Sequence, residues 1–192
     1  IIDRCRKKGV KVVAGGPLFT TDYSRFEDVD HLVLNEAEGS LLPFINDLSH
    51  GNAKRIYRCN YFPELKATPT PCWELIKKNS YDSMCIQYSR GCPHDCEFCD
   101  IVVLNGHQPR TKSPAQILNE LNKIYNIGWR GSVFFVDDNF IGNSNVLKKG
   151  LLPVIIKWMK EKEYPFNFFT EVSINLADDE ELMDMMSQAG FE

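Results

Sequence analysis

The sequence lacks any apolar run near the roughly 20 residues that span a bilayer, and it lacks the charged start and apolar core of a secretory signal. An excess of positive charge is also missing, because 22 Lys and Arg residues against 26 Asp and Glu give a formal net charge of −4. Without a basic surface, nucleic acid is not an expected partner. We therefore expect a cytoplasmic protein with no membrane span.

The chain also lacks an even number of cysteines, since it has seven, and three of them are clustered. This odd and clustered arrangement does not match the disulfide framework of a small secreted domain, and it suits a protein of the reducing cytosol. The hydrophobic share of 43% and the charged share of 25% are ordinary for a globular protein. The sequence starts at Ile1 inside an expected helix and stops at Glu192 just after another, so we expect a piece of a longer protein.

The clustered cysteines are the most informative feature. Cys92, Cys96 and Cys99 have the spacing C-x3-C-x2-C, and Phe98 precedes the last of them. The run 84–89 is typical of a buried strand, so the thiols begin where a strand ends, the position at which α/β folds present chemistry. Three thiols on one loop can hold three irons of a cubane cluster and leave the fourth open. A zinc site, or thiols that only pack in a core, are the alternatives.

Residues 1–51 alternate strand and helix. A strand at 10–14 is followed by Gly15 and Gly16, and a second strand at 31–34 precedes apolar positions that keep helical spacing up to Gly51. This order is typical of the C-terminal half of a doubly wound domain, although two glycines alone also suit a plain tight turn. Residues 52–82 have little periodicity and several prolines, which predicts a linker.

Residues 83–192 follow a β-α-β-α-β-α order. The expected strands are 84–89, 132–136 and 166–172, and the expected helices are 114–127, 151–162 and 179–189. The continuous apolar strand at 132–136 is typical of a parallel strand buried on both faces. Parallel strands with helical crossovers form either a doubly wound sheet or part of a barrel, and the pattern leaves both open.

Polar side chains stand at the ends of two of these strands. Asp137, Asp138 and Asn139 follow the second strand, and Glu171 lies near the end of the third. Ligands gather at the carboxyl ends of parallel strands, so these four are candidate binding residues. A solvated turn is the alternative for the first three, and a structural ion pair is the alternative for Glu171.

The C-x3-C-x2-C motif with an aromatic residue before its third cysteine resembles the cluster motif of the radical S-adenosylmethionine (SAM) enzymes. The resemblance implies that Cys92, Cys96 and Cys99 hold a [4Fe-4S] cluster whose fourth iron is chelated by SAM, and that Phe98 shields the cluster. It also implies that residues 83–192 are the first three β/α units of a partial TIM barrel. Members of the family cleave SAM reductively to a 5′-deoxyadenosyl radical, with an electron from a flavodoxin- or ferredoxin-type donor.

In this family, polar groups at the end of the second strand face the methionine amine of SAM. The resemblance therefore implies a SAM contact for Asp137, Asp138 or Asn139, although these residues depart from the family's commoner Gly-Gly-Glu motif. Glu171 is implied as a partner of the SAM ribose or amine. No catalytic side chain is assigned, because the cofactors carry the hard chemistry.

The first 51 residues carry a second resemblance. Strand-Gly-Gly-Pro followed by strand-Asn-Glu-Ala-Glu-helix is similar to the C-terminal part of the B12-binding domain that precedes many radical SAM barrels. The resemblance implies that Gly15 and Gly16 let the backbone approach the nucleotide tail of cobalamin. The family's cobalt-ligating histidine belongs to the first half of that domain, which this chain does not contain, and His31 is not that ligand.

Two further runs, 134–140 and 171–175, resemble the subgroup that includes hopanoid methylases. This resemblance implies methylation of an unactivated carbon on a small-molecule or lipid-like substrate. A methylthiotransferase acting on tRNA or protein is an alternative, but it would need three further cluster cysteines and a basic extension. A non-catalytic iron–sulfur or zinc-binding module is another. Cys59, Cys72 and Cys85 lie thirteen residues apart, and we interpret them as small buried hydrophobes rather than an auxiliary cluster.

Overall fold

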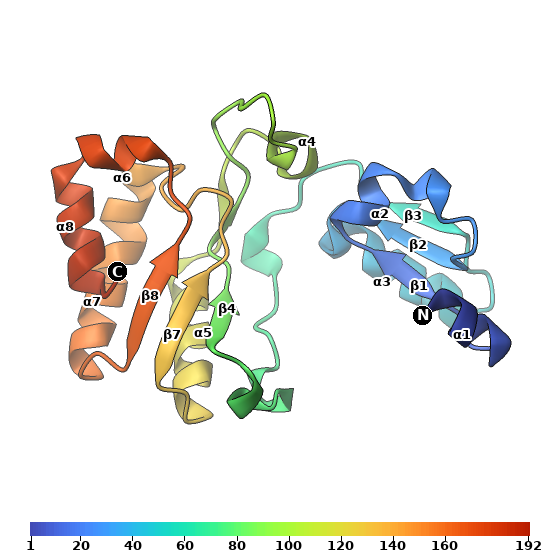
Figure 1. Ribbon diagram of the computed structural model, residues 1–192, viewed down its shortest axis with the longest axis horizontal. Helices are drawn as coiled ribbons and strands as arrows, with labels where there is room; N and C mark the ends of the chain where they lie inside the picture. Colours follow the sequence, from blue (N-terminus) through green and yellow to red (C-terminus); the bar gives the residue numbers. More distant parts are fainter. The chain divides into compact units, whose positions relative to one another are not determined.

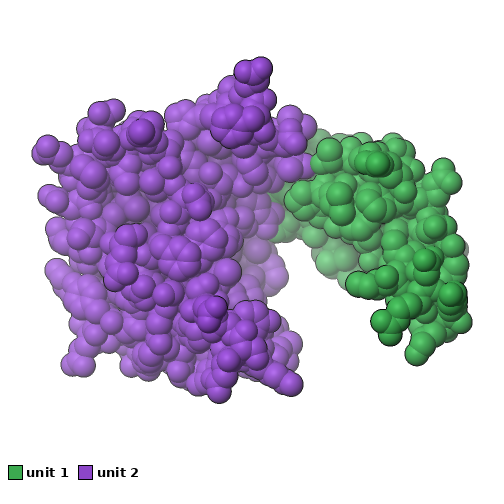
Figure 2. Space-filling model, viewed as in Figure 1, with its two compact units in different colours: residues 1–63 green, residues 64–192 purple.

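The computed structural model describes residues 1–192, and the chain divides into two compact units, Ile1–Pro63 and Glu64–Glu192 (Figure 2). The division lies within residues 52–82, the stretch predicted to be a linker. Each unit has its own three-stranded parallel sheet, so the chain has an α/β fold. None of its helices combines the length and the apolar character that crossing a membrane requires.

The first unit is built around β2 (His31–Leu34), which lies between β1 (Val13–Gly15) and β3 (Ile56–Arg58). Every residue of β2 is buried, as expected of a central parallel strand. The remaining elements of this unit are the helices α1 (Ile2–Lys7), α2 (Pro17–Thr21) and α3 (Ala37–Ser49), with a 3-10 turn at Tyr23–Arg25. Leu32 and Leu34 pack in one apolar cluster and Val33 in another, so the two faces of β2 are covered by different side chains.

Two predictions for this unit need correction. The strand predicted at 10–14 begins only at Val13, and β3 lies in a stretch for which no strand was predicted. β3 has three residues, of which only Tyr57 is buried, and this is too short to show a periodic pattern. A side chain at Gly15 would collide with the Val33 carbonyl, and Gly16 has φ +89° at the start of α2. The local backbone therefore already requires both glycines.

The second unit has the strand order β4-β7-β8, all parallel (Figure 1). Its strands are β4 (Ser83–Ile86), β7 (Gly131–Phe135) and β8 (Phe166–Thr170), and its long helices are α5 (Pro114–Asn126), α7 (Leu152–Glu161) and α8 (Glu180–Ala189). A capping box of Ser113 and Gln116 starts α5, with proline at the first helical position. The short elements are β5 (Ser89–Arg90), α4 (Ile101–Asn105), β6 (Arg110–Thr111), α6 (Ser144–Val146), a π-helical turn at Leu147–Leu151, and 3-10 turns at Leu65–Ala67, Trp73–Leu75, Lys78–Ser80 and Ile174–Asp178.

Helices cover one face of the β4-β7-β8 sheet. Val133 and Phe135 of β7 are completely buried in a core that also contains Leu121 of α5 and Ile155 of α7. On the opposite face, Cys85, Phe134 and Phe169 are aligned across the three strands, the two rings stack 4.7 Å apart, and Phe169 is exposed. The expectation that β7 is buried on both faces is therefore wrong for this chain, since only the helix-covered face is buried.

The segment after α8 returns to the outer edge of β8. The Phe168 N–H donates to the Gly190 carbonyl at 2.7 Å, and the Glu192 N–H donates to the Phe168 carbonyl at 2.9 Å. These bonds place Phe191 opposite Phe168 in parallel orientation. The β-α repeat thus continues in the same direction along the sheet.

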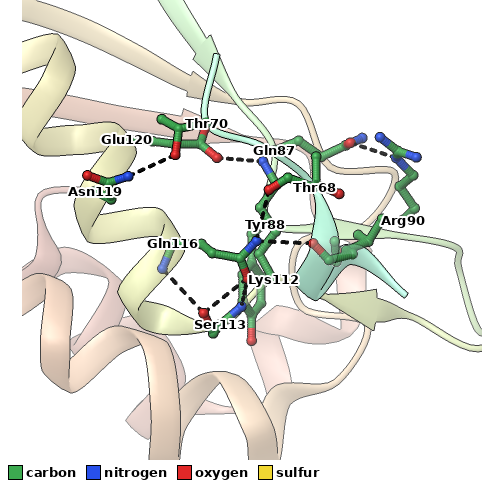
Figure 3. A network of polar contacts seen from close by, with 12 residues as sticks. Thr68, Thr70, Gln87, Tyr88, Arg90, Lys112, Ser113, Gln116, Asn119 and Glu120 are labelled. Atoms are coloured by element: carbon green, nitrogen blue, oxygen red, sulfur yellow. Dashed lines mark hydrogen bonds and ion pairs between the residues drawn. The ribbon is translucent and has the colours of Figure 1, made fainter. Parts of the chain in front are cut away.

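A polar network joins α5 to the segments packed against it (Figure 3). Lys112, just after β6, forms an ion pair of 2.6 Å with Glu120 of α5, and their side chains are only 5% and 2% exposed. Gln116 donates to the carbonyls of Leu65 and Thr68, and Asn119 donates to the Thr70 hydroxyl. These bonds fix residues 65–70, within the stretch predicted to be a linker, against α5 of the second unit, to which they belong.

Candidate functional site

The three clustered cysteines lie on one excursion of the chain between β5 and β6, residues 91–106, which we call the cysteine loop. Cys96 is exposed, Cys92 and Cys99 are half-buried, and Phe98 is 91% exposed. No three His, Cys, Asp or Glu side chains converge closely enough to hold a metal ion in this structure. The thiols therefore share a loop without forming a closed set of ligands, and metal binding requires their side chains to turn toward one another.

The two ends of the cysteine loop meet at a narrow neck formed by Gly91, Asn105, Gly106 and Asp138. One carboxylate oxygen of Asp138, Oδ2, accepts from the Gly91 N–H and from the Asn105 side-chain amide, each at 2.9 Å. The Cys92 N–H donates to the Gly106 carbonyl at 3.2 Å. Gly91 has φ +99°, and a Cβ there would lie 2.9 Å from the Gly106 carbonyl oxygen. Only glycine can occupy this position without moving the opposite end of the loop.

Asp137 holds the strand-to-loop connection that precedes the neck. Its Oδ1 accepts from the Ser89 N–H and the Ser89 hydroxyl, and its Oδ2 accepts from the Tyr88 N–H at 3.0 Å. The side chain is 3% exposed. Burial raises the pKa of Asp137 to about 6, although the hydrogen bonds from Ser89 and Tyr88 act in the opposite direction.

Because the pKa of Asp137 is raised, we expect the free energy of unfolding of the second unit to depend on pH. The folded chain binds this proton more tightly than the unfolded chain, so the free energy of unfolding should fall as the pH rises from about 4 to above 6. The shift from 3.8 to about 6 corresponds to a loss of about 3 kcal/mol. Asp137→Asn should remove this part of the pH dependence. It should also cost about 1–3 kcal/mol, because an amide accepts through one oxygen where the carboxylate accepts through two.

Urea denaturation at several pH values measures this effect. All three tryptophans, Trp73, Trp129 and Trp158, lie in the second unit, so their fluorescence reports on the unit that contains Asp137. Asp184→Asn is the matched control, because it makes the same chemical change at an exposed aspartate of α8 in the same unit. An unchanged pH slope in Asp137→Asn would contradict the assignment.

Asn139 links the end of β7 to the segment after β8 and to the first cysteine. Its amide nitrogen donates to the Ser173 hydroxyl at 3.1 Å and lies 4.0 Å from the Cys92 sulfur, and its oxygen accepts from the Ser173 N–H at 3.2 Å. Asn139 is 3% exposed. Of the residues predicted to contact SAM, Asp137, Asp138 and Asn139 thus all bond to other parts of the chain.

Glu171 differs from its sequence interpretation. β8 ends at Thr170, and the Glu171 side chain is exposed. An ion pair, which a buried carboxylate would need, is therefore not required of Glu171. Its backbone carbonyl accepts from the Phe140 N–H at 3.0 Å, which joins the loops after β7 and β8. A SAM contact through its carboxylate stays a prediction.

The sequence interpretation missed Asn105, Ser173 and the structural role of Gly91. A glycine directly before the first cysteine was a signal for a tight neck, since glycine tolerates positive φ and close backbone contact. Asn105 and Ser173 carried no comparable signal. The interpretation of Cys72 and Cys85 as buried hydrophobes is wrong, because both are exposed, whereas Cys59 is buried.

The donors on the cysteine loop suit an iron–sulfur cluster or zinc, since thiolates are the preferred ligands of both. The family model described as the Radical SAM superfamily matches residues 86–192, which include the loop, the neck and the ends of β7 and β8. The chain belongs to the radical SAM superfamily. This family implies a [4Fe-4S] cluster and SAM, and the position of three thiols on one loop above a parallel sheet fits both.

Several curated relatives of this radical SAM chain are methyltransferases. It is 47% identical over 193 residues to an uncharacterized methyltransferase of Synechocystis, covering all of this chain and 36% of that protein. It is 35% identical over 196 residues to the hopanoid C-2 methylase of Rhodopseudomonas palustris, covering 98% of this chain and 37% of that protein. The chain is thus a homologue of radical SAM methyltransferases and spans little more than a third of their length.

Solved structures show the same fold. The radical SAM methyltransferase TsrM of Kitasatospora setae, with cobalamin and a [4Fe-4S] cluster bound, matches with a TM-score of 0.76 at 17% identity, covering all of this chain and 43% of that one. OxsB, a cobalamin-dependent SAM radical enzyme with aqua-cobalamin and SAM bound, matches with a TM-score of 0.75 at 15% identity and 32% of its length. At these identities the likeness concerns the fold alone.

Proposed function

We propose that this chain is the part of a radical SAM methyltransferase that holds its iron–sulfur cluster. In this proposal Cys92, Cys96 and Cys99 ligate a [4Fe-4S] cluster, and SAM binds beside it at the carboxyl edge of β4, β7 and β8. The position of the three-thiol loop carries the proposal, because it stands directly beyond β4 and is joined to the residues after β7. In parallel α/β folds, ligands collect at this edge.

The chain's own residues would bind and orient the cofactors. The cysteines act as thiolates, a state that the bound metal itself favours. Phe98, beside Cys99 and almost fully exposed, is available to shield the cluster from water. The chemistry that such a cluster supplies is one-electron reduction of the SAM sulfonium group, which yields methionine and a 5′-deoxyadenosyl radical. Glu171 would meet SAM from the end of β8, where its side chain is exposed.

In our proposal, residues 83–192 are the first half of a partial TIM barrel. The parallel return of Phe191 to the edge of β8 supports a repeat that continues around a barrel. Residues 1–51 would then be the C-terminal part of a B12-binding domain, with residues 52–82 as the linker. Gly15 and Gly16 stand at the carboxyl end of β1, where a cobalamin nucleotide tail could approach the backbone.

The reaction proposed for the whole protein is cobalamin-dependent methylation of an unactivated carbon. The name of the Rhodopseudomonas palustris relative, hopanoid C-2 methylase, supports a small-molecule or lipid-like substrate. A flavodoxin- or ferredoxin-type protein would supply the electron. Nucleic acid is not among the proposed partners, in keeping with the net charge of −4.

Anaerobic reconstitution with iron and sulfide tests the proposal. We expect about four irons per chain, as a cubane cluster requires, and a charge-transfer absorption that changes when SAM is added. Dithionite should then produce 5′-deoxyadenosine and methionine from SAM if the SAM contacts within this chain suffice. One tightly held zinc and no iron would overturn the proposal in favour of a non-catalytic zinc module.

A further inference from the structure

Asp138 is the acidic side chain that accepts hydrogen bonds from both ends of the cysteine loop. Both bonds to Asp138 end on the same oxygen, Oδ2, one from the residue directly before Cys92 and the other from the last residue of α4. One acceptor thus joins two points of the chain that are fourteen residues apart, Gly91 and Asn105. Hydrogen bonds to a carboxylate are roughly twice as strong as those between neutral groups.

The contacts of Asp138 and its two neighbours differ from those of a solvated turn. Asp138 is half-buried, and its neighbours Asp137 and Asn139 are both 3% exposed and bonded to other segments. Asp137 holds the residues before the neck, and the Asn139 amide lies 4.0 Å from the Cys92 sulfur. The three consecutive residues therefore fix the start of the cysteine loop from the end of β7.

Closure of the neck lowers the entropy cost of bringing the three thiols together, because it joins the ends of the loop that carries them. A flexible loop whose ends are free must lose more conformational entropy to gather its ligands than one whose ends are already joined. The backbone bond from the Cys92 N–H to the Gly106 carbonyl lies beside the two Asp138 bonds, and a Cβ at Gly91 would lie 2.9 Å from the same carbonyl oxygen. Without Asp138, the neck would keep this bond, the bond from the Arg110 side chain to the Asn105 carbonyl and the neighbouring β5-β6 pairing, but the Gly91 N–H would lose its carboxylate acceptor.

We infer that Asp138 is a positioning residue that closes the neck of the cysteine loop and so prearranges Cys92, Cys96 and Cys99 for cluster assembly. It acts through Gly91 and Asn105 rather than by touching the cluster. The closure of the neck is a property of the metal-free chain. Its effect on iron rests on the function proposed above.

Hydrogen exchange of the metal-free chain tests the closure directly. In Asp138→Ala, the amide protons of Gly91 and Cys92 should exchange roughly tenfold faster, because two bonds to a charged group are lost. Asp138→Asn should stay within about threefold of the unchanged protein, since its amide oxygen can accept both bonds. Asp184→Ala, an exposed aspartate on α8, is the matched control and should change neither proton.

Unchanged exchange at Gly91 and Cys92 in Asp138→Ala would overturn the inference. So would an Asp138→Asn variant as fast as Asp138→Ala, because an acceptor oxygen would then not be what closes the neck. If Asp138→Ala does not fold, Asn105→Ala removes one of the two donors and should still raise exchange at Gly91 and Cys92. An Asn105→Ala variant that exchanges like the unchanged chain would then overturn the inference.

Iron binding provides the second readout. After reconstitution, Asp138→Ala should hold its cluster about 10- to 100-fold more weakly in a chelator titration, the usual effect of losing a group that orients metal ligands. Asp138→Asn should recover most of this loss. Equal chelator resistance in Asp138→Ala and the unchanged protein would contradict the positioning role. If the unchanged chain takes up no iron, the proposed function fails, whereas the exchange rates still decide whether Asp138 closes the neck.

Discussion

Cys96→Ala should lose the cluster completely, falling from about four irons per chain to background after anaerobic reconstitution. The loop offers only three thiols, and a cubane cluster held by this loop would need all of them. Cys96 is exposed, and its replacement by alanine removes almost no packing. The loss of iron would therefore report ligation and not unfolding, which tryptophan fluorescence can verify.

Two other exposed cysteines provide the matched controls. Cys72→Ala and Cys85→Ala make the same chemical change at thiols outside the cysteine loop, and both variants should keep the full iron content. A Cys96→Ala protein with undiminished iron would contradict the ligand assignment. Iron lost equally from the Cys72 or Cys85 variant would point instead to cluster binding by other thiols of the chain.

Much of the second unit could be predicted from sequence. The strands of its sheet were expected at 84–89, 132–136 and 166–172, and β4, β7 and β8 lie within these ranges apart from the single residues Ser83 and Gly131. Apolar runs and helix caps are local signals, so each element can be recognised alone. The β5-β6 hairpin could not, because each of its strands has only two residues. The π-helical turn at Leu147–Leu151 was not predicted, since this helix was expected to begin only at 151.

The neck illustrates what sequence cannot supply. Ile86 pairs with Phe135 across β4 and β7, so the same register two residues further on sets Tyr88 opposite Asp137. Asp138 then faces the chain that leads into the cysteine loop. The motif identified the thiols, and the strand-end rule identified Asp137 to Asn139 as functional candidates. Their partners lie 33 to 49 residues away, and only the strand order and register bring them together.

Lys112→Met should be among the most destabilising single changes in the second unit, with a free energy of unfolding lowered by about 3–5 kcal/mol at neutral pH. Lys112 and Glu120 are almost fully buried, and Glu120 Oε2 has no hydrogen-bond partner. Removal of the ammonium group leaves a buried carboxylate without the only side chain that is hydrogen-bonded to it. The double variant Lys112→Met with Glu120→Leu should recover most of the loss, because it leaves no charge buried.

An exposed ion pair in the same unit is the control. Lys157 and Glu161 lie 3.8 Å apart with side chains 80% and 58% exposed, and Lys157→Met should cost no more than about 0.5 kcal/mol. Urea denaturation followed by tryptophan fluorescence compares the three variants. A loss in Lys112→Met as small as that in Lys157→Met would show that the buried pair contributes little.

The pH dependence separates an unpaired charge from lost packing. Burial already raises the pKa of Glu120, although Lys112 acts against the rise, and without Lys112 the pKa must rise further. The penalty in Lys112→Met should therefore grow as the pH rises above the usual value for glutamate and shrink in acid, where the carboxyl is neutral in both states. A stability loss that stays constant with pH would indicate lost packing.

The ion pair is also linked to the cysteine loop through the backbone. The Lys112 backbone N–H donates to the Tyr88 carbonyl at 2.8 Å, and the Tyr88 backbone N–H donates to the Asp137 carboxylate. Because the pair ties Lys112 to α5, and Lys112 in turn is bonded to the strand that enters the cysteine loop, Lys112→Met should also speed amide exchange at Gly91.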